Sequence, residues 1–398
     1  MQSVLDKLVY LYYPLLLVLL FAGAKWYGRG KWNEESMSLE QMKTVQGFSA
    51  VCIMFHHLSQ KTCASWLPKK YIVHGLDFFV PLGYFFVSIF FFCSGYGLYK
   101  SLKTKPDYLK GFFRKRVLPL IAGYYLSGAV YLLVRFLMGE KFTPYSLFCY
   151  VSGIKLCNTN AWFVIALPTF YLFFYLAYRF CRNEKLALLF VCLGIFCYTW
   201  IGTYVNHPDY WMRGEWWYNS VHLFPIGLFF AMKEEKILAN MKKLYPLRLI
   251  LSFVLTIGFY VLSEIAQAIW GYYGEAWHAD HIVLRRWGCL MTQVAASCAF
   301  VYFVVLLCRK VKLGNRVLRF FGTITMEFYL IHGIFIELFG FSFLDITRPV
   351  YYIRNVALFV AVVIICSIPA ALLFRELLQF VLHPAIYPEK WKRRKTSA

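Results

Sequence analysis

The chain has 398 residues, of which 60% are hydrophobic and 20% aromatic, while only 16% are charged. This composition is too apolar for a water-soluble globular protein, and it excludes a soluble enzyme. The formal net charge of +22 arises from Lys and Arg residues that concentrate in alternate loops, a distribution that is typical of membrane proteins and excludes nucleic acid as a partner.

Eleven apolar segments approach the ~20 residues that a helix needs to cross a bilayer, and they recur along the whole chain. They are residues 8–28, 44–59, 76–99, 117–138, 161–180, 186–203, 217–232, 249–269, 287–307, 321–343 and 355–374. The sequence therefore predicts an all-α fold, a polytopic membrane helix bundle of about eleven spans. The first span has no basic leader and no small-residue cleavage site, so we expect it to be retained and not cleaved as a signal peptide.

The placement of basic residues predicts the orientation of the bundle. With the amino terminus outside, about 30 of the 42 Lys and Arg residues face the cytoplasm, whereas the opposite orientation inverts this bias. We therefore expect a cytoplasmic carboxyl terminus, whose basic tail, residues 381–398, would contact anionic membrane lipid. The twelve cysteines form no CxxC pair and no His/Cys spacing typical of zinc, so no metal site is predicted.

The second span holds the main candidate for catalysis. Gln46 precedes His57 by eleven residues, about three helical turns, so the two side chains share one face of the helix. His56 is rotated by about 100° from His57, so the two histidines cannot face the bundle equally. An imidazole can take a proton from a hydroxyl nucleophile, which makes His57 the predicted catalytic residue. The alternative is a histidine packed against a neighbouring carbonyl group.

Two further features surround the end of the third span. The segment Phe90–Gly97 contains small residues, Ser94 among them, that would permit close approach of another helix. Arg114, Lys115 and Arg116 then precede the fourth span, where they suit a phosphate-rich ligand that arrives from the cytosol. The same basic residues also satisfy the positive-inside rule, which would be a purely topological role.

Later spans carry three more candidates. Trp162 begins the fifth span, either as an interfacial anchor or as part of a binding site. Glu327 and His332 lie within one span, where ionisable groups are costly, and both are candidates for a substrate channel. They are five residues apart and so do not stack on one helix face; a paired structural role is the alternative.

Over roughly residues 38–380, the chain resembles the acyltransferase-3 family of bacterial membrane acyltransferases, and five short motifs in register carry the resemblance. The family pattern of a basic residue, ten residues and a histidine corresponds to Gln46 and His57 in this chain. The family motifs FFxxSG and R..P correspond to Phe90–Gly95 and Arg116–Pro119, and the motifs WFL and YLxH correspond to Trp162–Val164 and Tyr329–His332. The chain departs from the family at Gln46, where arginine is usual, and at Ser88, where an acidic residue often precedes FFxxSG. Arg114 or Arg116 would compensate for the arginine, or the chain belongs to a branch with altered donor or acceptor preference.

The resemblance implies a ten-helix core in residues 38–380, an extra amino-terminal helix in residues 1–37 and the tail 381–398. It implies an O-acetyltransferase-like enzyme of the bacterial plasma membrane that needs no bound cofactor. The co-substrate would be acyl-CoA, expected to be acetyl-CoA, and the acceptor a hydroxyl group of a cell-surface or lipid-linked carbohydrate. Besides His57 as the catalytic residue, the residues expected to bind substrate or donor are Gln46, Ser94, Arg114, Lys115, Arg116, Trp162, Glu327 and His332.

Two other classes of protein remain open. Ten or more spans with polar residues near the midplane also describe a transporter or flippase for a sugar or lipid, although no pseudo-repeat and no paired Gly/Pro-broken helices are evident. A non-catalytic relative with the same fold is the third reading, because Gln46 replaces the family arginine. Dependence on acyl-CoA discriminates the enzyme from both.

Overall fold

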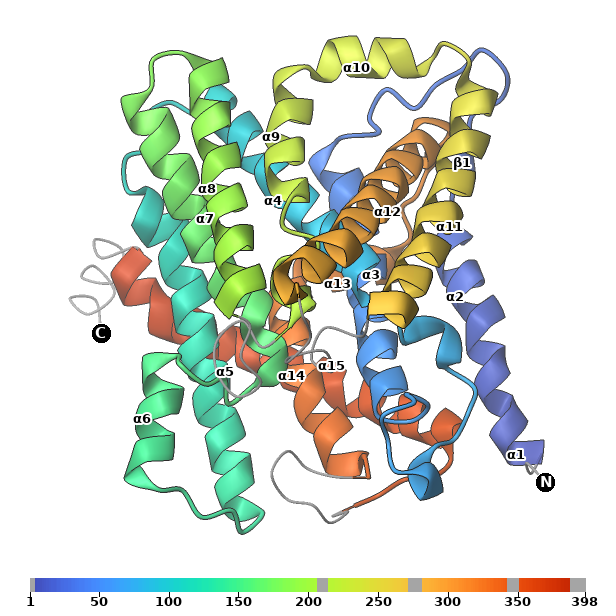
Figure 1. The fold of residues 1–398 in the computed structure, drawn as a ribbon, viewed down its shortest axis with the longest axis vertical. Coiled ribbons are helices and arrows are strands. Elements are labelled where there is room, and N and C mark those ends of the chain that lie inside the picture. The colour runs from blue at the N-terminus through green and yellow to red at the C-terminus, as the bar shows by residue number, and fades with distance from the viewer. Residues whose placement is uncertain (1–3, 206–213, 271–280, 342–350, 387–398) are drawn as a thin grey trace, which may run out of the picture.

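Helices make up almost all of the regular structure in a computed structural model that describes residues 4–205, 214–270, 281–341 and 351–386 (Figure 1). The predicted all-α membrane bundle is therefore confirmed. The strands of the described residues are β1 (Lys25–Trp26) and β2 (Val311–Lys312), which pair antiparallel. The terminal segment 387–398, which holds most of the predicted basic tail, lies outside the described residues.

Among the residues that the structure describes, seven helical segments are long and apolar enough to cross a bilayer. They contain α4 (Gly83–Thr104), η4 with α5 (Phe113–Val117 and Leu118–Leu137), η5 with α7 (Thr159–Ala161 and Trp162–Phe180), α8 (Glu184–Val205), α11 (Tyr245–Trp270), α12 (Ile282–Lys310) and α15 (Val356–Ile386). A further pair of helices, α13 (Arg316–Thr323) and α14 (Thr325–Phe339), passes the same test only when the two are taken together, and they meet at an angle of 86°. The predicted span 321–343 begins inside α13 and crosses this break, so the prediction of one continuous helix was wrong there; no proline in the sequence marks the bend.

The other predicted spans coincide with helices that are shorter or more polar. They are η1 with α2 (Leu8–Leu11 and Tyr12–Phe21), α9 (Leu223–Met232) and α3 (Leu39–Gln60). The first of these ends at Phe21, earlier than expected, because the chain then turns into β1. Two helices occupy predicted loops, α6 (Pro144–Ser152) and α10 (Glu234–Met241), and the remaining short turns are α1 (Val4–Lys7), η2 (Lys69–Tyr71), η3 (Asp77–Phe79) and η6 (Glu215–Trp217).

The polar helix α3 lies inside the bundle, where it packs against α4, α13 and α14. Glycines permit its closest approach. A Cβ atom built on Gly47 would lie 2.1 Å from the carbonyl oxygen of Leu318, and one built on Gly322 would lie 2.2 Å from that of Lys43. The backbones of α3 and α13 therefore touch, which seats the short helix α13 against the helix that carries the two histidines.

A second glycine contact joins α4 to α9 and confirms that the third span contains a close helix packing site. A Cβ atom on Gly95 would lie 2.0 Å from the carbonyl oxygen of Phe224, and one on Gly227 would lie 2.2 Å from that of Phe92. Such contacts let backbones approach without intervening side chains. The FFxxSG segment is thus held against α9.

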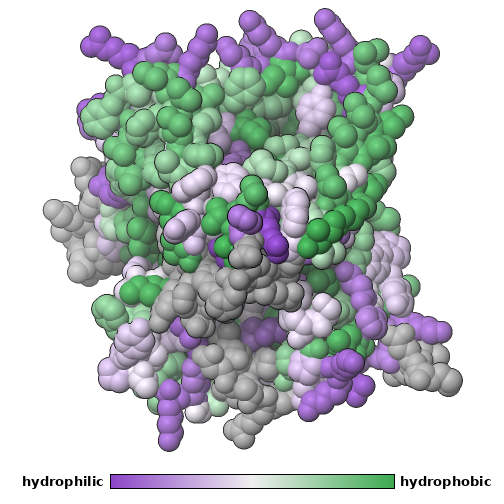
Figure 2. Space-filling view, in the orientation of Figure 1, coloured by the Kyte–Doolittle hydropathy of each residue, from purple (hydrophilic) through white to green (hydrophobic). Residues whose placement is uncertain are grey.

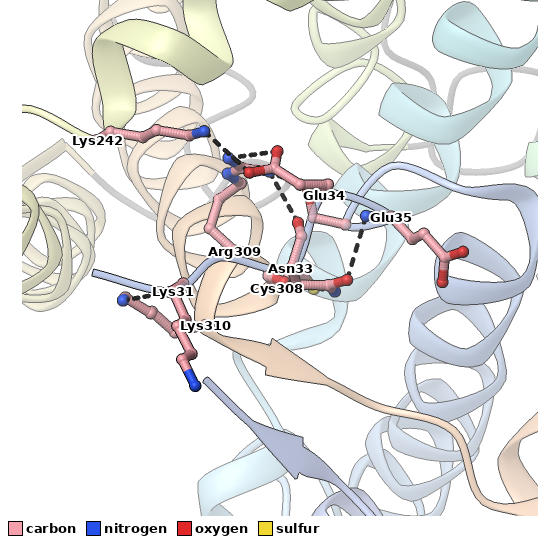
Figure 3. A network of polar contacts seen from close by, with 9 residues as sticks. Lys31, Asn33, Glu34, Glu35, Lys242, Cys308, Arg309 and Lys310 are labelled. Atoms are coloured by element: carbon pink, nitrogen blue, oxygen red, sulfur yellow. Dashed lines mark hydrogen bonds and ion pairs between the residues drawn. The ribbon is translucent and has the colours of Figure 1, made fainter. Parts of the chain in front are cut away.

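The amino-terminal segment is fastened to the bundle at both of its ends. Near its start, the Tyr12 hydroxyl donates to the carbonyl oxygen of Ala357 on α15 at 2.9 Å. After α2, the fully buried Arg309 donates to the carbonyl oxygen of Asn33 at 2.7 Å and to the Glu34 carboxylate at 3.2 Å (Figure 3). Lys242 also reaches the Glu34 carboxylate at 2.9 Å (Figure 3). These contacts tie the loop before α3 to the end of α12.

Large apolar side chains are exposed along the outside of the bundle. Figure 2 shows hydrophobic side chains over much of the upper part of one face and hydrophilic side chains along its top edge. The exposed residues on α11 include Leu247, Ile250, Leu251, Phe253, Val254 and Ile257. An apolar face of this extent fits contact with lipid tails and not with water.

Candidate active site

Two histidines from helices far apart in the sequence face each other inside the bundle. His57 lies one turn before the end of α3, and His332 lies in the middle of α14. The Nδ1 atom of His57 is 2.8 Å from the Nε2 atom of His332, and their ring planes are inclined by only 12°. His332 is fully buried. Both were predicted site residues, but their contact was not predicted.

Hydrogen bonding determines which ring nitrogen carries the proton in each neutral histidine. Nδ1 of His332 lies 2.7 Å from the carbonyl oxygen of Phe328, which can only accept, so this nitrogen is the protonated one. Nε2 of His332 is then an acceptor, and Nδ1 of His57 donates to it. The remaining nitrogen of His57, Nε2, keeps its lone pair. The pair therefore holds His57 in the tautomer that a general base requires.

His56 takes the structural role that the sequence left open between the two neighbouring histidines. Its Nδ1 atom lies 2.9 Å from the carbonyl oxygen of Phe79. A Cβ atom on Gly83 would lie 2.4 Å from its Nε2 atom, so the ring rests directly on the first turn of α4. His56 thus anchors the loop before α4, and the pairing with α14 belongs to His57.

The turn before α7 is fastened to the helix that carries His332. The side-chain amide of Asn158 donates to the carbonyl oxygen of Leu330 at 3.0 Å. The Tyr329 hydroxyl donates to the carbonyl oxygen of Asn160, and the ring of Tyr329 lies 6.4 Å from that of His57. Sequence reasoning considered this polar stretch only for Trp162 and missed both asparagines. Two amides just before an apolar helix were the available signal.

An ion pair joins α3 and α14 about one helical turn beyond the two histidines. Lys61, one turn beyond His57, lies 2.9 Å from the Glu337 carboxylate, which belongs to the α14 turn that follows His332. The Glu337 side chain is only 10% exposed. Neither residue was predicted, because each is a single charged residue near the end of an apolar segment. The pair joins α3 to α14 beside the two imidazole rings.

Trp162 lies inside the bundle and not at the lipid interface. Only 6% of this residue is exposed, and its ring lies 6.0 Å from that of Trp217 and 6.1 Å from that of Phe91. The interpretation of Trp162 as an interfacial anchor is therefore wrong. Its neighbour Phe163 lies 6.0 Å from the ring of Tyr329, so this helix start reaches the wall around His57.

Ser94 and Arg116 both lie near Tyr171, a residue in the middle of α7. The Ser94 hydroxyl lies 2.9 Å from the hydroxyl of Tyr171 on α7. Arg116 is half-buried, donates to the Tyr108 hydroxyl at 2.9 Å, and lies near enough to Tyr171 to act on it electrostatically. Arg114 and Lys115 are exposed. The structure thus brings Arg116 and Ser94 to the same tyrosine, and leaves the other two cations at the surface.

Two predicted residues stand apart from the histidine pair. Gln46 shares the α3 face of His57, but three helical turns put it about 16 Å away along the axis. Glu327, in the first turn of α14, is half-buried and interacts electrostatically with Arg375 of α15. The structure does not place Glu327 and His332 on one face of their helix. Within the described residues, no group of three His, Cys, Asp or Glu side chains is arranged to hold a metal ion.

The comparison with known proteins rests on the family match. No curated protein and no solved structure matches the chain significantly. A family model described as an acyltransferase domain matches residues 39–376, which include α3, α4, α7 and α14 and therefore every side chain of the site described above. This match, together with the apolar helix bundle, shows that the chain is a multi-pass membrane protein that belongs to the acyltransferase-3 family.

Proposed function

We propose that this acyltransferase moves an acyl group from cytoplasmic acyl-CoA, with acetyl-CoA as the expected donor, to a hydroxyl group of a cell-surface or lipid-linked carbohydrate. The observation that carries the proposal is the contact between Nδ1 of His57 and Nε2 of His332, which assigns the proton of His57 to Nδ1 and the lone pair to its Nε2. This nitrogen takes the proton of the acceptor hydroxyl while the oxygen attacks the thioester carbonyl. The same imidazolium then returns the proton to the departing thiolate.

A series of polar and aromatic side chains supports a donor route from the basic segment to His57. Arg116 would bind a phosphate of CoA, because a guanidinium matches phosphate geometry. From the neighbouring Ser94 and Tyr171 pair, the α4 helix leads within one turn to Phe91. The ring of Phe91 lies 4.7 Å from that of Phe163, which in turn packs against Tyr329 beside His57. A pantetheine arm laid along this series would bring its thioester toward the base.

The positive-inside pattern supports an acceptor on the opposite side of the membrane. With the amino terminus outside, α3 runs outward and His57 lies near its outer end. The donor would therefore come from the cytoplasm and the carbohydrate from the cell exterior, at a bacterial plasma membrane. The Lys61–Glu337 pair lies between His57 and this outer surface, where its two charged groups suit contact with sugar hydroxyls.

A carrier for a sugar or lipid is the second candidate, and one observation favours it. The 86° break between α13 and α14 resembles the discontinuous helices that form substrate sites in transporters. However, α13 is packed backbone to backbone against α3 through Gly47 and Gly322, which makes the break a fixed part of the core. The family match also favours the enzyme.

The test uses purified protein in lipid nanodiscs, acetyl-CoA radiolabelled in the acetyl group, and glycans extracted from a bacterial cell envelope. The expected result is release of CoA together with transfer of label to the glycan fraction. Transport of labelled sugar in proteoliposomes, without thioester cleavage, would support the carrier. Failure of the folded protein to bind or cleave acyl-CoA would contradict the proposed function.

A further inference from the structure

Two hydrogen-bond donors converge on one point beside His332. The point is the position that a Cβ atom would occupy at Gly333, the residue after His332 on α14. The Tyr131 hydroxyl of α5 lies 2.4 Å from this point, and the Nδ2 atom of Asn160 lies 2.9 Å from it. Glycine is therefore required at position 333, because both donors pack against its Cα atom and so lie close to each other.

Both donors are unused among the described residues. Tyr131 is 2% exposed, and its hydroxyl is buried without a hydrogen-bond partner in that part of the chain. An unpaired buried hydroxyl costs about 1–3 kcal/mol. The Tyr131 hydroxyl differs from that of Tyr124 because a second donor, the Asn160 amide, lies against the same glycine. The hydrogen bonds of Asn160 are made by its backbone: its N–H donates to the side-chain oxygen of Asn158 at 3.1 Å, and its carbonyl oxygen accepts from the Tyr329 hydroxyl. These bonds fix the residue and leave its side-chain amide available.

Tyr329 and Gly333 on α14 connect the two donors with the histidine pair. Gly333 directly follows His332, which holds His57. Tyr329, which holds the backbone of Asn160, lies 6.4 Å from the His57 ring and 6.2 Å from the His332 ring. A thioester carbonyl placed beside Gly333 would have its oxygen between the two donors and its carbon on the side of the histidine pair. Donors that are preorganised around a developing oxyanion are the strongest contribution to such reactions.

We propose that Tyr131 and Asn160 form the oxyanion hole of this enzyme, an inference that rests on the proposed function. The acceptor oxygen bonds to the acyl carbon, and His57 Nε2 takes the hydroxyl proton. The carbonyl π electrons move to the oxygen, which accepts hydrogen bonds from the Tyr131 hydroxyl and the Asn160 amide. When the carbon–sulfur bond breaks, the carbonyl re-forms and the thiolate leaves with the proton from His57. The acyl donor is a thioester, and no oxidant or metal is required.

The test compares Tyr131→Phe and Asn160→Ala with wild type in the nanodisc assay, with acyl-CoA as the varied substrate. Each loss of a donor should lower kcat by about 10²–10³-fold, and KM for acyl-CoA should stay the same, because the bonds strengthen only as the oxyanion forms. Tyr131→Phe keeps the ring and its packing, so it separates the hydroxyl from folding. Tyr124→Phe is the matched control, because Tyr124 lies two turns earlier on α5, is 3% exposed and also has a buried hydroxyl unpaired among the described residues.

A second variant displaces both donors together. In Gly333→Ala the added methyl group collides with the Tyr131 hydroxyl and the Asn160 amide and moves them from their positions, so kcat should fall while the binding of CoA is kept. The inference is overturned if Tyr131→Phe and Asn160→Ala both match Tyr124→Phe in kcat while His57→Ala is inactive. If wild type does not cleave acyl-CoA, the proposed function itself is contradicted, and the oxyanion hole is contradicted with it.

Discussion

Nδ1 of His57 lies 2.8 Å from Nε2 of His332, although 275 residues separate them in the chain. The contact explains why α3, a helix too polar to qualify as an ordinary span, lies in the interior, where α13 and α14 surround it. It also defines a chain of three groups, a backbone carbonyl oxygen and two imidazole rings. The last of them, His57, presents an unprotonated nitrogen.

The first prediction concerns His332 as a positioning residue. His332→Ala removes the acceptor that keeps the proton on Nδ1 of His57. Once His57 has taken a proton this hydrogen bond involves a charged group and is worth about 1.5–3 kcal/mol, so kcat should fall by about 10–100-fold. His332→Gln offers an amide oxygen to the same Nδ1 and should recover part of the loss. The measurement is kcat across pH, with KM for acyl-CoA as a check. A His332→Ala enzyme with wild-type kcat at every pH would show that the contact is structural.

A second prediction follows from the glycine contact between α3 and α13. Gly47→Ala places a methyl group against the Leu318 carbonyl oxygen, and such overpacking should destabilise the protein by about 1–3 kcal/mol. Gly258→Ala on α11 is the control, because nothing lies within 4 Å of its Cβ position and alanine is the better helix former. The apparent melting temperature in detergent should fall for the first variant and hold or rise for the second. Equal melting temperatures would contradict the close packing.

The third prediction concerns Arg116 and the acyl donor. Arg116→Ala should raise KM for acyl-CoA by about 10–100-fold, the worth of one charge-assisted hydrogen bond, and kcat should change little. The effect should shrink at high salt, because added ions screen an interaction at the membrane edge. Arg179→Ala on α7 is the control, since this exposed arginine lies in the last turn of its helix and contributes only to the general positive charge. An equal rise in KM for both variants would show that Arg116 acts through general electrostatic attraction and makes no specific contact with the acyl donor.

The fourth prediction concerns the contacts of Glu34 with Lys242 and Arg309, which hold the amino-terminal segment against the bundle. The hydrogen bond from Lys242, followed by that from Arg309, lowers the pKa of Glu34 below its ordinary value of 4.5. Because the folded pKa is the lower one, the stabilisation is present above 4.5 and is lost as the pH falls through the folded value. The carboxylate is largely exposed, so the contribution is about 0–1 kcal/mol. Glu34→Gln should therefore melt slightly below wild type near neutral pH.

In acid the two proteins should melt together, because wild type has then lost the same charge. Arg309→Met should be more damaging at every pH, since it also strips the buried Asn33 carbonyl oxygen of its donor. A Glu34→Gln deficit that persists unchanged at about pH 3 would contradict the ionic origin of the contact.

The positions of most helices could be predicted from the apolar segments, because length and hydropathy are local properties of the chain. Helix ends were less accurate: α2 stops at Phe21, since the following residues find a strand partner near residue 311 that the local sequence does not reveal. The break after Thr323 was missed for the same reason. Next to the break, Gly322 lies against the backbone of Lys43 on another helix, a contact that the local sequence does not reveal.

For the site as well, local features could be predicted from the sequence, and contacts between distant segments could not. His57 and His332 each stood out as polar groups within apolar helices, which is a local signal. Their pairing, the choice of His57 over His56 and the proposed roles of Tyr131 and Asn160 depend on contacts between α3, α5, η5 and α14. Tyr131 in particular is one aromatic residue among many on an apolar helix, and nothing in its sequence surroundings distinguishes it from Tyr124.

The most direct test of the central claim is the turnover of acyl-CoA by His57→Ala and His56→Asn, each in nanodiscs and at equal amounts of folded protein. His56→Asn keeps a side-chain nitrogen near the Phe79 carbonyl oxygen, so it controls for the loss of one of two adjacent histidines. His57→Ala should lose about 10²–10⁴-fold in kcat, and His56→Asn should turn over acyl-CoA like wild type. Wild-type turnover by His57→Ala would contradict the assignment of His57 as the catalytic base.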